Sequence, residues 1–346
     1  MTKTDTYITS AIRALPKAEL HLHIEGTLEP EMVFDLAEKH NIQLSYINIA
    51  ALRSAYNFSN LQSFLDIYYQ GVEVLRDEDD FFRLTDAYLQ RAHADGVVHT
   101  EIFFDPQSHI ERGIPLSAVF DGIKRALENG ERDYGISHRL IPCFLRHLSE
   151  AAAMQTLEAL LPYKEFICAV GLDSSENGHP PSKFSRVFAR ARAEGLLTVA
   201  HAGEEGPSSY IWEAIDDLQV SRIDHGVGCE ADELLCQRLA KERIPLTVCP
   251  ISNIKLAIYT RMESHNLKRL LARGLCVTVS SDDPAYFGGY LLDNLLAVQQ
   301  SLELTMVEIQ TLARNSIEAS FLTEDEKQVW LNKIDEYAQQ YEAVRC

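Results

Sequence analysis

Four short segments of the chain contain histidine and carboxylate side chains of the types that bind metal ions. These segments are His21-Leu22-His23, His201-Ala202-Gly203-Glu204, Asp224-His225 and Ser281-Asp282-Asp283. Three histidines and one carboxylate, with room for a water molecule, are typical of a hydrolytic zinc site. Zinc lowers the pKa of a bound water to about 7 and so produces hydroxide at neutral pH. The residue types therefore indicate metal-assisted hydrolysis, and the candidate ligands are His21, His23, His201 and Asp282.

Three further polar residues accompany these candidate ligands. Glu204 lies three residues beyond His201, where a loop could direct its carboxylate at a substrate beside the metal. His225 could orient or deprotonate a metal-bound water, and Asp283 could accept a hydrogen bond from substrate. Each also has an ordinary explanation: Glu204 could stabilise a helix N-terminus, and Asp283 could be a turn residue. A non-catalytic metal-binding protein would explain the four ligands but not these three neighbours together.

Each of these segments lies at the end of a short apolar run that we predict to be a β-strand. Eight strands are predicted, over residues 18–24, 97–104, 139–145, 167–172, 196–201, 222–225, 245–249 and 275–280. Near-continuous apolar runs are typical of strands in a parallel sheet that is covered on both faces. The segments between the strands have the residue spacing of helices, for example residues 181–194, 232–242 and 265–273. Alternating strands and helices predict right-handed βαβ units, and eight such units close most simply into a (β/α)8 TIM barrel.

The barrel explains why the polar segments should meet. In a TIM barrel the active site lies at the carboxyl ends of the strands, and the segments end the first, fifth, sixth and eighth predicted strands. His21 and His23 are two residues apart on a strand, so both should face the barrel interior. Two unpaired imidazoles would be costly in a buried core, and a bound metal removes that cost.

Two segments extend the predicted barrel. A long interval after the first strand contains helical patterns near residues 30–40 and 61–74, so we expect a structured insertion. Residues 324–343 are predicted to form an amphipathic helix as a C-terminal extension. The chain has 346 residues, which would allow two domains. Because no linker or internal repeat is visible, residues 1–346 are expected to form a single domain.

Composition limits the partners of this chain. Its formal net charge is −19, from 51 acidic and 32 basic residues, and no cluster of Lys and Arg is present that would bind a phosphate backbone. We therefore expect a small-molecule substrate and no nucleic acid. No apolar run reaches the roughly 20 residues that span a bilayer, and the N-terminus lacks the pattern of a secretory signal. The scattered cysteines suit a reducing compartment. The expected location is cytoplasmic, and the oligomeric state is left open.

The motifs resemble those of the adenosine deaminase family of metal-dependent aminohydrolases. The matching segments are LPKAELHLHIEGTLEPE, GLDSSENGHPP, VAHAGEEGP, RIDHGVGC, LTVCPISNIKL and VTVSSDDPAYFGGY, which follow the family order over residues 15–290. The resemblance implies a (β/α)8 barrel with one zinc ion per chain. It implies zinc ligands at His21, His23, His201 and Asp282, a proton-donating glutamate at Glu204, a water-activating histidine at His225 and a purine N7-binding aspartate at Asp283. Iron or manganese could bind the same ligands.

Two departures from the nucleoside-deaminating pattern bear on which purine is bound. Glu25 stands where adenosine deaminases usually have an Asp that serves the ribose 5′-hydroxyl, and Glu176 stands where they have a Gly next to purine N3. Free adenine carries a ring proton on N9 or N3, whereas a nucleoside carries its sugar on N9. The hypothesis is that Glu176 accepts this proton and excludes ribose, since an unpaired buried carboxylate would cost about 1–3 kcal/mol. The ordinary alternative for Glu176 is a surface loop carboxylate.

The segments HIEGTLEPE and DSSENG resemble the adenine deaminase branch of the family. The resemblance thus implies zinc-dependent hydrolysis of adenine to hypoxanthine and ammonia, a reaction of purine salvage. Gly178 is expected to let the backbone approach the purine unless it is a plain turn glycine. Phe64 and Leu65 are expected to form an apolar lid unless they only pack a helix. Adenosine, an N6-substituted adenine and an aminofutalosine-type nucleoside remain alternative substrates.

Two other enzyme classes fit the sequence less well. Residues 226–231, GVGCEA, loosely match the dinucleotide-binding pattern G-x-G-x-x-G/A. The next predicted strand ends in Cys249-Pro250, where a ribose-binding acid is expected, so a nicotinamide oxidoreductase is rejected. Cytosine and guanine deaminases share the His-x-His pair and a final Asp, but HAGEEG and SSDDPAYFGGY point away from them.

Overall fold

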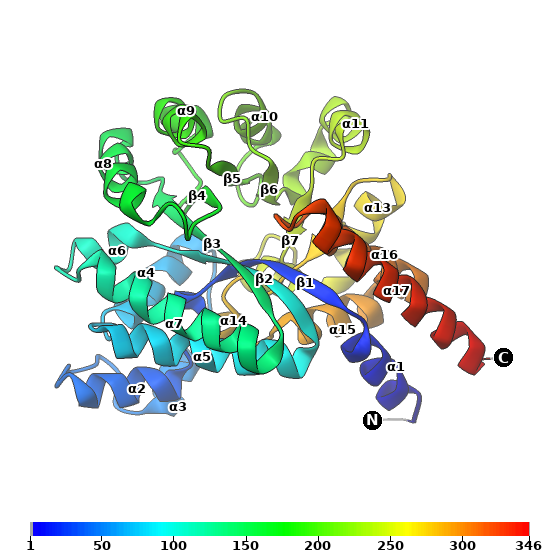
Figure 1. Ribbon diagram of the computed structural model, residues 1–346, viewed down its shortest axis with the longest axis horizontal. Coiled ribbons are helices and arrows are strands. Elements are labelled where there is room, and N and C mark those ends of the chain that lie inside the picture. The colour runs from blue at the N-terminus through cyan, green and yellow to red at the C-terminus, as the bar shows by residue number, and fades with distance from the viewer. Residues whose placement is uncertain (1–2, 346) are drawn as a thin grey trace.

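The computed structural model describes residues 3–345 and contains eight parallel strands in the order β1 to β8 (Figure 1). The strands are β1 (Lys17–His23), β2 (Val97–Phe104), β3 (Ser137–Leu145), β4 (Ala169–Asp173), β5 (Leu197–Ala202), β6 (Arg222–His225), β7 (Leu246–Val248) and β8 (Val277–Val279). Every strand lies at or near its predicted position, and each pairs in parallel with the next. The predicted (β/α)8 TIM barrel is confirmed.

The barrel closes between its last and first strands through the backbone of Asp282. Leu22 in β1 and Asp282, just after β8, form an isolated parallel bridge. The Asp282 N–H donates to the carbonyl of His21 at 3.1 Å, and the His23 N–H donates to the carbonyl of Asp282 at 3.0 Å. Closure of the sheet therefore fixes the spacing between the two strand ends that carry three of the candidate metal ligands.

The interval between β1 and β2 folds into the α-helices α2 (Pro30–Lys39), α3 (Ile49–Ala55), α4 (Leu61–Val72) and α5 (Glu78–Asp95). α2 and α4 confirm the two predicted helical segments, whereas α3 and α5 were not predicted. Asn60 sets the start of α4, because its side chain accepts a hydrogen bond from the Ser63 N–H in a capping box. Gly96 ends α5 with φ +80°, a left-handed conformation that favours glycine. The insertion is thus structured, as expected.

The other helices follow or precede single strands and cover the outside of the barrel (Figure 1). They are α1 (Lys3–Ala14), α6 (Pro106–Ile110), α7 (Leu116–Tyr134), α8 (Glu150–Leu160), α9 (Ser185–Ala193), α10 (Ser208–Asp216), α11 (Glu233–Glu242), α12 (Pro250–Lys255), α13 (Leu267–Ala272), α14 (Pro284–Phe287), α15 (Leu291–Ser301), α16 (Met306–Glu318) and α17 (Glu324–Arg345). α9, α11 and α13 confirm predicted helices. α17 confirms the C-terminal extension and packs against α16.

A layer of polar side chains fills the barrel interior below the candidate metal ligands. Glu19 is two residues before His21 on β1, so it faces the same side one layer deeper. Arg222 from β6 and Glu101 from β2 form an ion pair with both side chains fully buried. Tyr88 donates a hydrogen bond to Glu19 at 2.8 Å. Because buried charges are tolerated when they are paired, this layer provides a fixed floor for the site above it.

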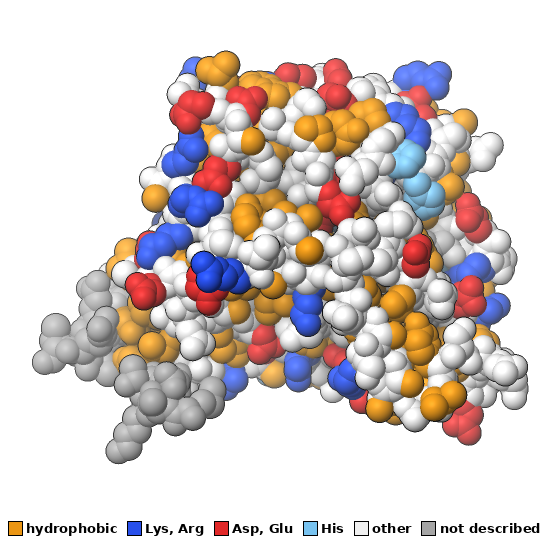
Figure 2. Space-filling view, turned by 180° about the vertical axis from the view of Figure 1, so that it is seen from behind, with side chains coloured by type: hydrophobic (Ala, Val, Ile, Leu, Met, Phe, Trp, Pro, Cys, Tyr) orange, Lys and Arg blue, Asp and Glu red, His pale blue; other side chains and the backbone are white. Residues whose placement is uncertain are grey.

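The described residues were also examined for membrane-spanning helices, charged surface patches and cysteine burial. No described helix is both long enough and apolar enough to cross a bilayer. On the face drawn in Figure 2, described Lys and Arg side chains are interspersed with Asp and Glu. Of the described cysteines, Cys168 is half-buried and the others are buried, while Cys346 lies outside the described residues. The absence of a nucleic-acid partner and the single domain over residues 1–346 stay predictions.

Candidate active site

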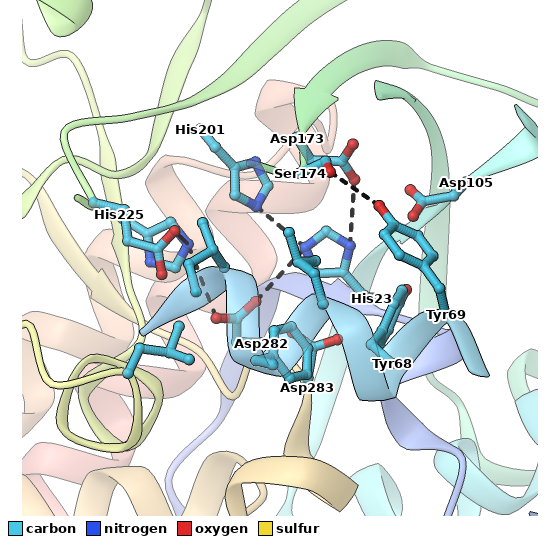
Figure 3. Close-up of a pocket in the computed structure, with 15 residues that line it drawn as sticks. His23, Tyr68, Tyr69, Asp105, Asp173, Ser174, His201, His225, Asp282 and Asp283 are labelled. Atoms are coloured by element: carbon cyan, nitrogen blue, oxygen red, sulfur yellow. Dashed lines mark hydrogen bonds and ion pairs between the residues drawn. The ribbon is translucent and has the colours of Figure 1, made fainter. Parts of the chain in front are cut away.

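The structure brings the four candidate metal ligands together at the carboxyl ends of the strands. His21 and His23 come from β1, His201 from β5, and Asp282 follows β8. One nitrogen or carboxylate oxygen from each lies within 4.8 Å of those of the others. His23 Nε2 is 3.1 Å from His201 Nε2, and His21 Nε2 is 3.2 Å from Asp282 Oδ1. Figure 3 shows His23, His201 and Asp282 directed toward one another.

The protonation states of this cluster suit a metal ion. Burial, followed by the charges of the neighbouring histidines, lowers the pKa of His201 well below its ordinary value, and burial lowers the pKa of His23 to about 4. Although burial disfavours a charge on Asp282, the adjacent His21 holds the pKa of Asp282 well below its usual range. His21 Nε2 is buried and has no hydrogen-bond partner. Because zinc binds neutral imidazole and ionised carboxylate, these residues fit a zinc ion.

Polar residues lie behind the three histidines. His21 Nδ1 is 3.0 Å from Thr247 Oγ1, which donates a hydrogen bond to Asp224 Oδ1 at 2.9 Å, so this hydrogen bond orients the His21 ring. His201 Nδ1 is 3.7 Å from Asp224 Oδ2, and His23 Nδ1 is 3.6 Å from Asp173 Oδ2. Carboxylates behind ligating histidines commonly raise the basicity of the ligand. Sequence reasoning missed Thr247, Asp224 and Asp173 in this position, although Thr247 and Asp224 lie on predicted strands and Asp173 directly follows one.

Two site residues adopt a backbone conformation that is rare outside glycine. His225 has φ +63° at the end of β6, and Asp282 has φ +65° after β8. Left-handed conformations cost free energy for residues with a Cβ and are concentrated at functional sites. In both positions the chain turns sharply at the strand end, which directs the side chain to the centre of the barrel mouth.

Glu204, His225 and Asp283 lie around the metal ligands. Glu204 Oε2 is 3.6 Å from His225 Nε2, which is 3.9 Å from Asp282 Oδ2. Burial, followed by the negative charge of Asp282, raises the pKa of Glu204 well above its ordinary value. The same two causes raise the pKa of Asp283. Both carboxyl groups can therefore hold a proton near neutral pH, and each has one buried oxygen without a hydrogen-bond partner.

A pocket lies in front of this constellation. His23, His201, Asp282 and the three neighbours Glu204, His225 and Asp283 line one side of it. The other side is formed mainly by α4, through Leu61, Phe64, Leu65, Tyr68 and Tyr69. The expectation that Phe64 and Leu65 face the substrate pocket agrees with this position, while their action as a lid stays a prediction.

The structure contradicts the expectation that the Glu176 carboxylate faces the substrate. Its two oxygens accept hydrogen bonds from four consecutive backbone N–H groups, those of Gly203, Glu204, Glu205 and Gly206, at 2.6–3.0 Å. Glu176 is buried and is not among the residues that line the pocket. Its carboxylate holds the loop that carries Glu204 instead of facing the pocket, so the filter hypothesis is wrong.

Glu25 and Gly178 also lie outside the lining of the pocket. Glu25 Oε1 accepts hydrogen bonds from the Asp105 N–H at 3.0 Å and from His109 at 2.8 Å, so it supports the wall of the pocket from behind. Gly178 has φ +81° and open space where a Cβ would stand. The plain explanation, a turn glycine, therefore applies to Gly178. The sequence did not indicate where the side chains of these loop residues point.

Gly26 has a steric role that the sequence analysis did not predict. A Cβ on Gly26 would lie 2.0 Å from Asp283 Oδ1 and 2.7 Å from the Asp283 Cα. Gly26 directly follows Glu25 in the turn after β1, where the backbone approaches Asp283 closely. Only glycine permits this approach, so Gly26 contributes to the position of Asp283.

Comparison with known proteins places the chain in a family. A family model described as adenosine deaminase matches residues 16–337. The adenine deaminase of Acinetobacter baylyi is 58% identical over 325 residues, which cover 94% of this chain and 98% of that protein. The crystal structure of an adenine deaminase from Arthrobacter aurescens has a TM-score of 0.93 and 51% identity, covering 94% of this chain and 100% of that one. An amidohydrolase from Burkhoderia ambifaria with bound Zn has a TM-score of 0.89 and 25% identity, covering 99% and 96%. The chain belongs to the adenosine deaminase family.

Proposed function

We propose that this protein is an adenine deaminase that hydrolyses adenine to hypoxanthine and ammonia. The observation that carries the reaction type is the position of Glu204, His225 and Asp283 around a four-donor metal cluster at the wall of one pocket. The choice of adenine is supported by relatives named adenine deaminase that are 53–59% identical over most of the chain. Purine salvage is the metabolic setting of this reaction, and the cytoplasmic location stays a prediction from the sequence.

One zinc ion would be held by His21, His23, His201 and Asp282. When bound there, zinc supplies Lewis-acid chemistry: it lowers the pKa of a water molecule and so provides a nucleophile at neutral pH. Support for zinc comes from the donor set and from the zinc-containing relative. Thr247 orients the His21 ring through its hydrogen bond, and the carboxylates of Asp224 and Asp173 lie behind His201 and His23.

The proton transfers are assigned to Glu204 and His225. Protonated Glu204 donates to N1 of the purine, which makes C6 more electrophilic. Neutral His225 accepts the proton of the attacking water, since burial lowers the pKa of His225 to about 3 and so keeps a free ring nitrogen. The amino group leaves as ammonia with one added proton, the one that His225 took from water, as the C6–N bond breaks. The proton from Glu204 stays on N1 of hypoxanthine, and the C6 hydroxyl returns its proton to Glu204 as the carbonyl forms. The balance is one adenine and one water consumed for one hypoxanthine and one ammonia.

Asp283 orients the ring. Its raised pKa lets the carboxyl group stay protonated and donate a hydrogen bond to the lone pair of N7. This contact and the donation from Glu204 to N1 lie on opposite sides of C6, so together they fix C6 at the metal cluster. Preorganised donors at the atoms where charge develops are a large source of rate enhancement.

Isotope labelling of the product tests the proposed reaction. We expect the zinc-loaded protein to convert adenine in ¹⁸O-enriched water into hypoxanthine with one ¹⁸O atom, and to release one equivalent of ammonia. Unchanged adenine in a protein that binds zinc would instead support a non-catalytic metal-binding barrel. Glu204→Gln removes the proton donor but no metal ligand, and it should lower kcat by about 10²–10⁴-fold at unchanged zinc content.

A further inference from the structure

The pocket contains one carboxylate that the reaction above does not use, that of Asp105. Asp105 directly follows β2 and occupies the N-cap position of α6. Aspartate at this position usually accepts a hydrogen bond from the N–H groups of the first helical turn. The Asp105 side chain makes no such cap. Its carboxyl group instead lines the pocket, and its Oδ1 is buried without a hydrogen-bond partner.

A chain of hydrogen bonds behind the pocket wall fixes the position of Asp105. Arg112 Nη2 lies 2.8 Å from His109 Nδ1, and because arginine only donates, this ring nitrogen must accept. Neutral His109 then carries its proton on Nε2 and donates it to Glu25 Oε1 at 2.8 Å. The same oxygen accepts the Asp105 N–H at 3.0 Å. Glu25 therefore positions the backbone of Asp105, and the Asp105 carboxyl group stays directed into the pocket.

Asp105 lies on the side of the pocket where the five-membered ring of a purine would extend. In Figure 3 it lies beyond His23, away from His225, and next to Tyr69 and Asp173. Asp105 and Asp283 line the same pocket, together with Tyr68. Because Asp283 is assigned to N7, a carboxyl group on the same side of the pocket is well placed for N9, the other nitrogen of the five-membered ring.

We propose that Asp105 determines the specificity for the free base, by accepting the N9–H hydrogen bond of adenine at Oδ1. This inference rests on the proposed function for the orientation of the purine. A nucleoside has no proton on N9, so it would leave the buried oxygen unpaired and would press its sugar against Asp105. A buried acceptor without a partner costs about 1–3 kcal/mol, which corresponds to roughly 5–150-fold in affinity. Asp105 thus takes the role that the sequence suggested for Glu176.

Two of the polar groups near Asp105 interact with other residues. The Tyr69 hydroxyl lies 2.9 Å from Ser174 Oγ, which is also 2.9 Å from His147 Nδ1. Asp173 Oδ2 faces the candidate metal ligand His23 at 3.6 Å, whereas Asp173 Oδ1, like Asp105 Oδ1, is buried without a hydrogen-bond partner. Among the described residues on this side of the pocket, Asp105 is therefore the carboxyl group that has a free oxygen and no ion pair with a candidate metal ligand.

Binding and turnover of adenine and 9-methyladenine by the zinc-loaded protein test the proposal. The two ligands differ in the N9 proton, which 9-methyladenine lacks. Wild-type protein should bind adenine at least 10-fold more tightly than 9-methyladenine, and Asp105→Ala should weaken adenine binding about 10-fold while leaving 9-methyladenine equal or tighter. Asp217→Ala, at an exposed aspartate outside the pocket, is the control for Asp105→Ala and should leave both affinities unchanged.

Two results would overturn the role of Asp105. These are equal binding of the two ligands by wild-type protein and an equal loss for both ligands in Asp105→Ala. The comparison of adenine with 9-methyladenine in wild-type protein tests the role of Asp105 even if Asp105→Ala does not fold. Affinities measured by calorimetry report on the role of Asp105, whereas ammonia release reports on the proposed function. A protein that binds adenine through Asp105 but releases no ammonia would refute the deaminase assignment alone.

Discussion

At the residue scale, the site depends on which carboxyl groups are paired and which are free. Glu176 has the four backbone hydrogen bonds described above, whereas Glu204, Asp283 and Asp105 each keep one buried oxygen without a partner. Pairing of such oxygens is favourable, so the unpaired ones that line the pocket are where we expect a substrate to bind. Glu25 Oε2 and Asp224 Oδ2 are also unpaired, but they lie outside the pocket lining. The difference between a positioning carboxylate and a recognising one thus follows from their hydrogen bonds.

The role of Glu176 gives a prediction at this scale. Glu176→Gln leaves one acceptor oxygen for four N–H groups, so we expect the free energy of unfolding to fall by about 2 kcal/mol or more. Loosening of the loop should lower kcat/KM for adenine without producing turnover of adenosine. Urea denaturation and ammonia release measure these effects, with Glu165→Gln at an exposed glutamate as the control. A gain in adenosine turnover at unchanged stability would contradict this role and revive Glu176 as the filter.

The metal ligands could be predicted from sequence because strand geometry is regular. His21 and His23 must share a face since they are two apart in β1, and the carboxyl ends of parallel strands must meet. The loop residues Glu176, Glu25 and Gly178 could not be placed, because a side chain in a loop has no periodicity that gives its direction. Asp105 was missed for the same reason, although it follows a strand that was predicted with correct bounds.

At the element scale, α4 forms one side of the pocket and is attached to the barrel near both ends. Glu205 Oε1 accepts the Leu61 N–H at 3.0 Å at the start of α4, and Tyr69 pairs with Ser174 near its end. The eight strands were predictable from apolar runs. By contrast α3 and α5 were not predicted, although Phe81, Leu84 and Tyr88 recur at helical spacing in α5. Asp77 and Gly96 also supply the two ends of α5. The contact of α4 with Glu205 could not be predicted at all.

The attachment of α4 can be tested by hydrogen exchange. Glu205→Ala removes the acceptor for the Leu61 N–H, so we expect the amides of residues 61–72 to exchange roughly 10-fold faster. Because α4 helps to exclude water from the pocket, kcat/KM for adenine should fall as well. Glu165→Ala, in an exposed turn, provides the comparison. Unchanged exchange in α4 would show that apolar packing alone holds this helix in place.

At the scale of the whole molecule, the buried ion pair of Glu101 and Arg222 links barrel stability to pH. Although burial opposes the charge, Arg222 lowers the pKa of Glu101 from 4.5 to about 2. Ionised Glu101 therefore stabilises the folded state above pH 4.5, and this contribution is lost as the pH falls toward 2. The shift corresponds to a contribution on the order of 3 kcal/mol.

Acid denaturation of matched variants tests this linkage. Glu101→Gln should be less stable than wild type at pH 7, because Arg222 loses its charged partner. Between pH 5 and pH 3 the variant should then lose less stability than wild type, measured by urea denaturation at each pH. Glu324→Gln, whose parent side chain is 90% exposed, should keep the wild-type pH dependence. Parallel curves for wild type and Glu101→Gln would show that another group controls acid stability.

The central claim is that this metal site deaminates free adenine. The most direct test is ammonia release from adenine, adenosine, deoxyadenosine and N6-methyladenine by the zinc-loaded protein under identical conditions. The account predicts that kcat/KM is highest for adenine, that both nucleosides are turned over at least 10-fold less efficiently, and that Glu204→Gln abolishes most of the activity. Turnover of adenosine above that of adenine would contradict the assignment of substrate and the role given to Asp105.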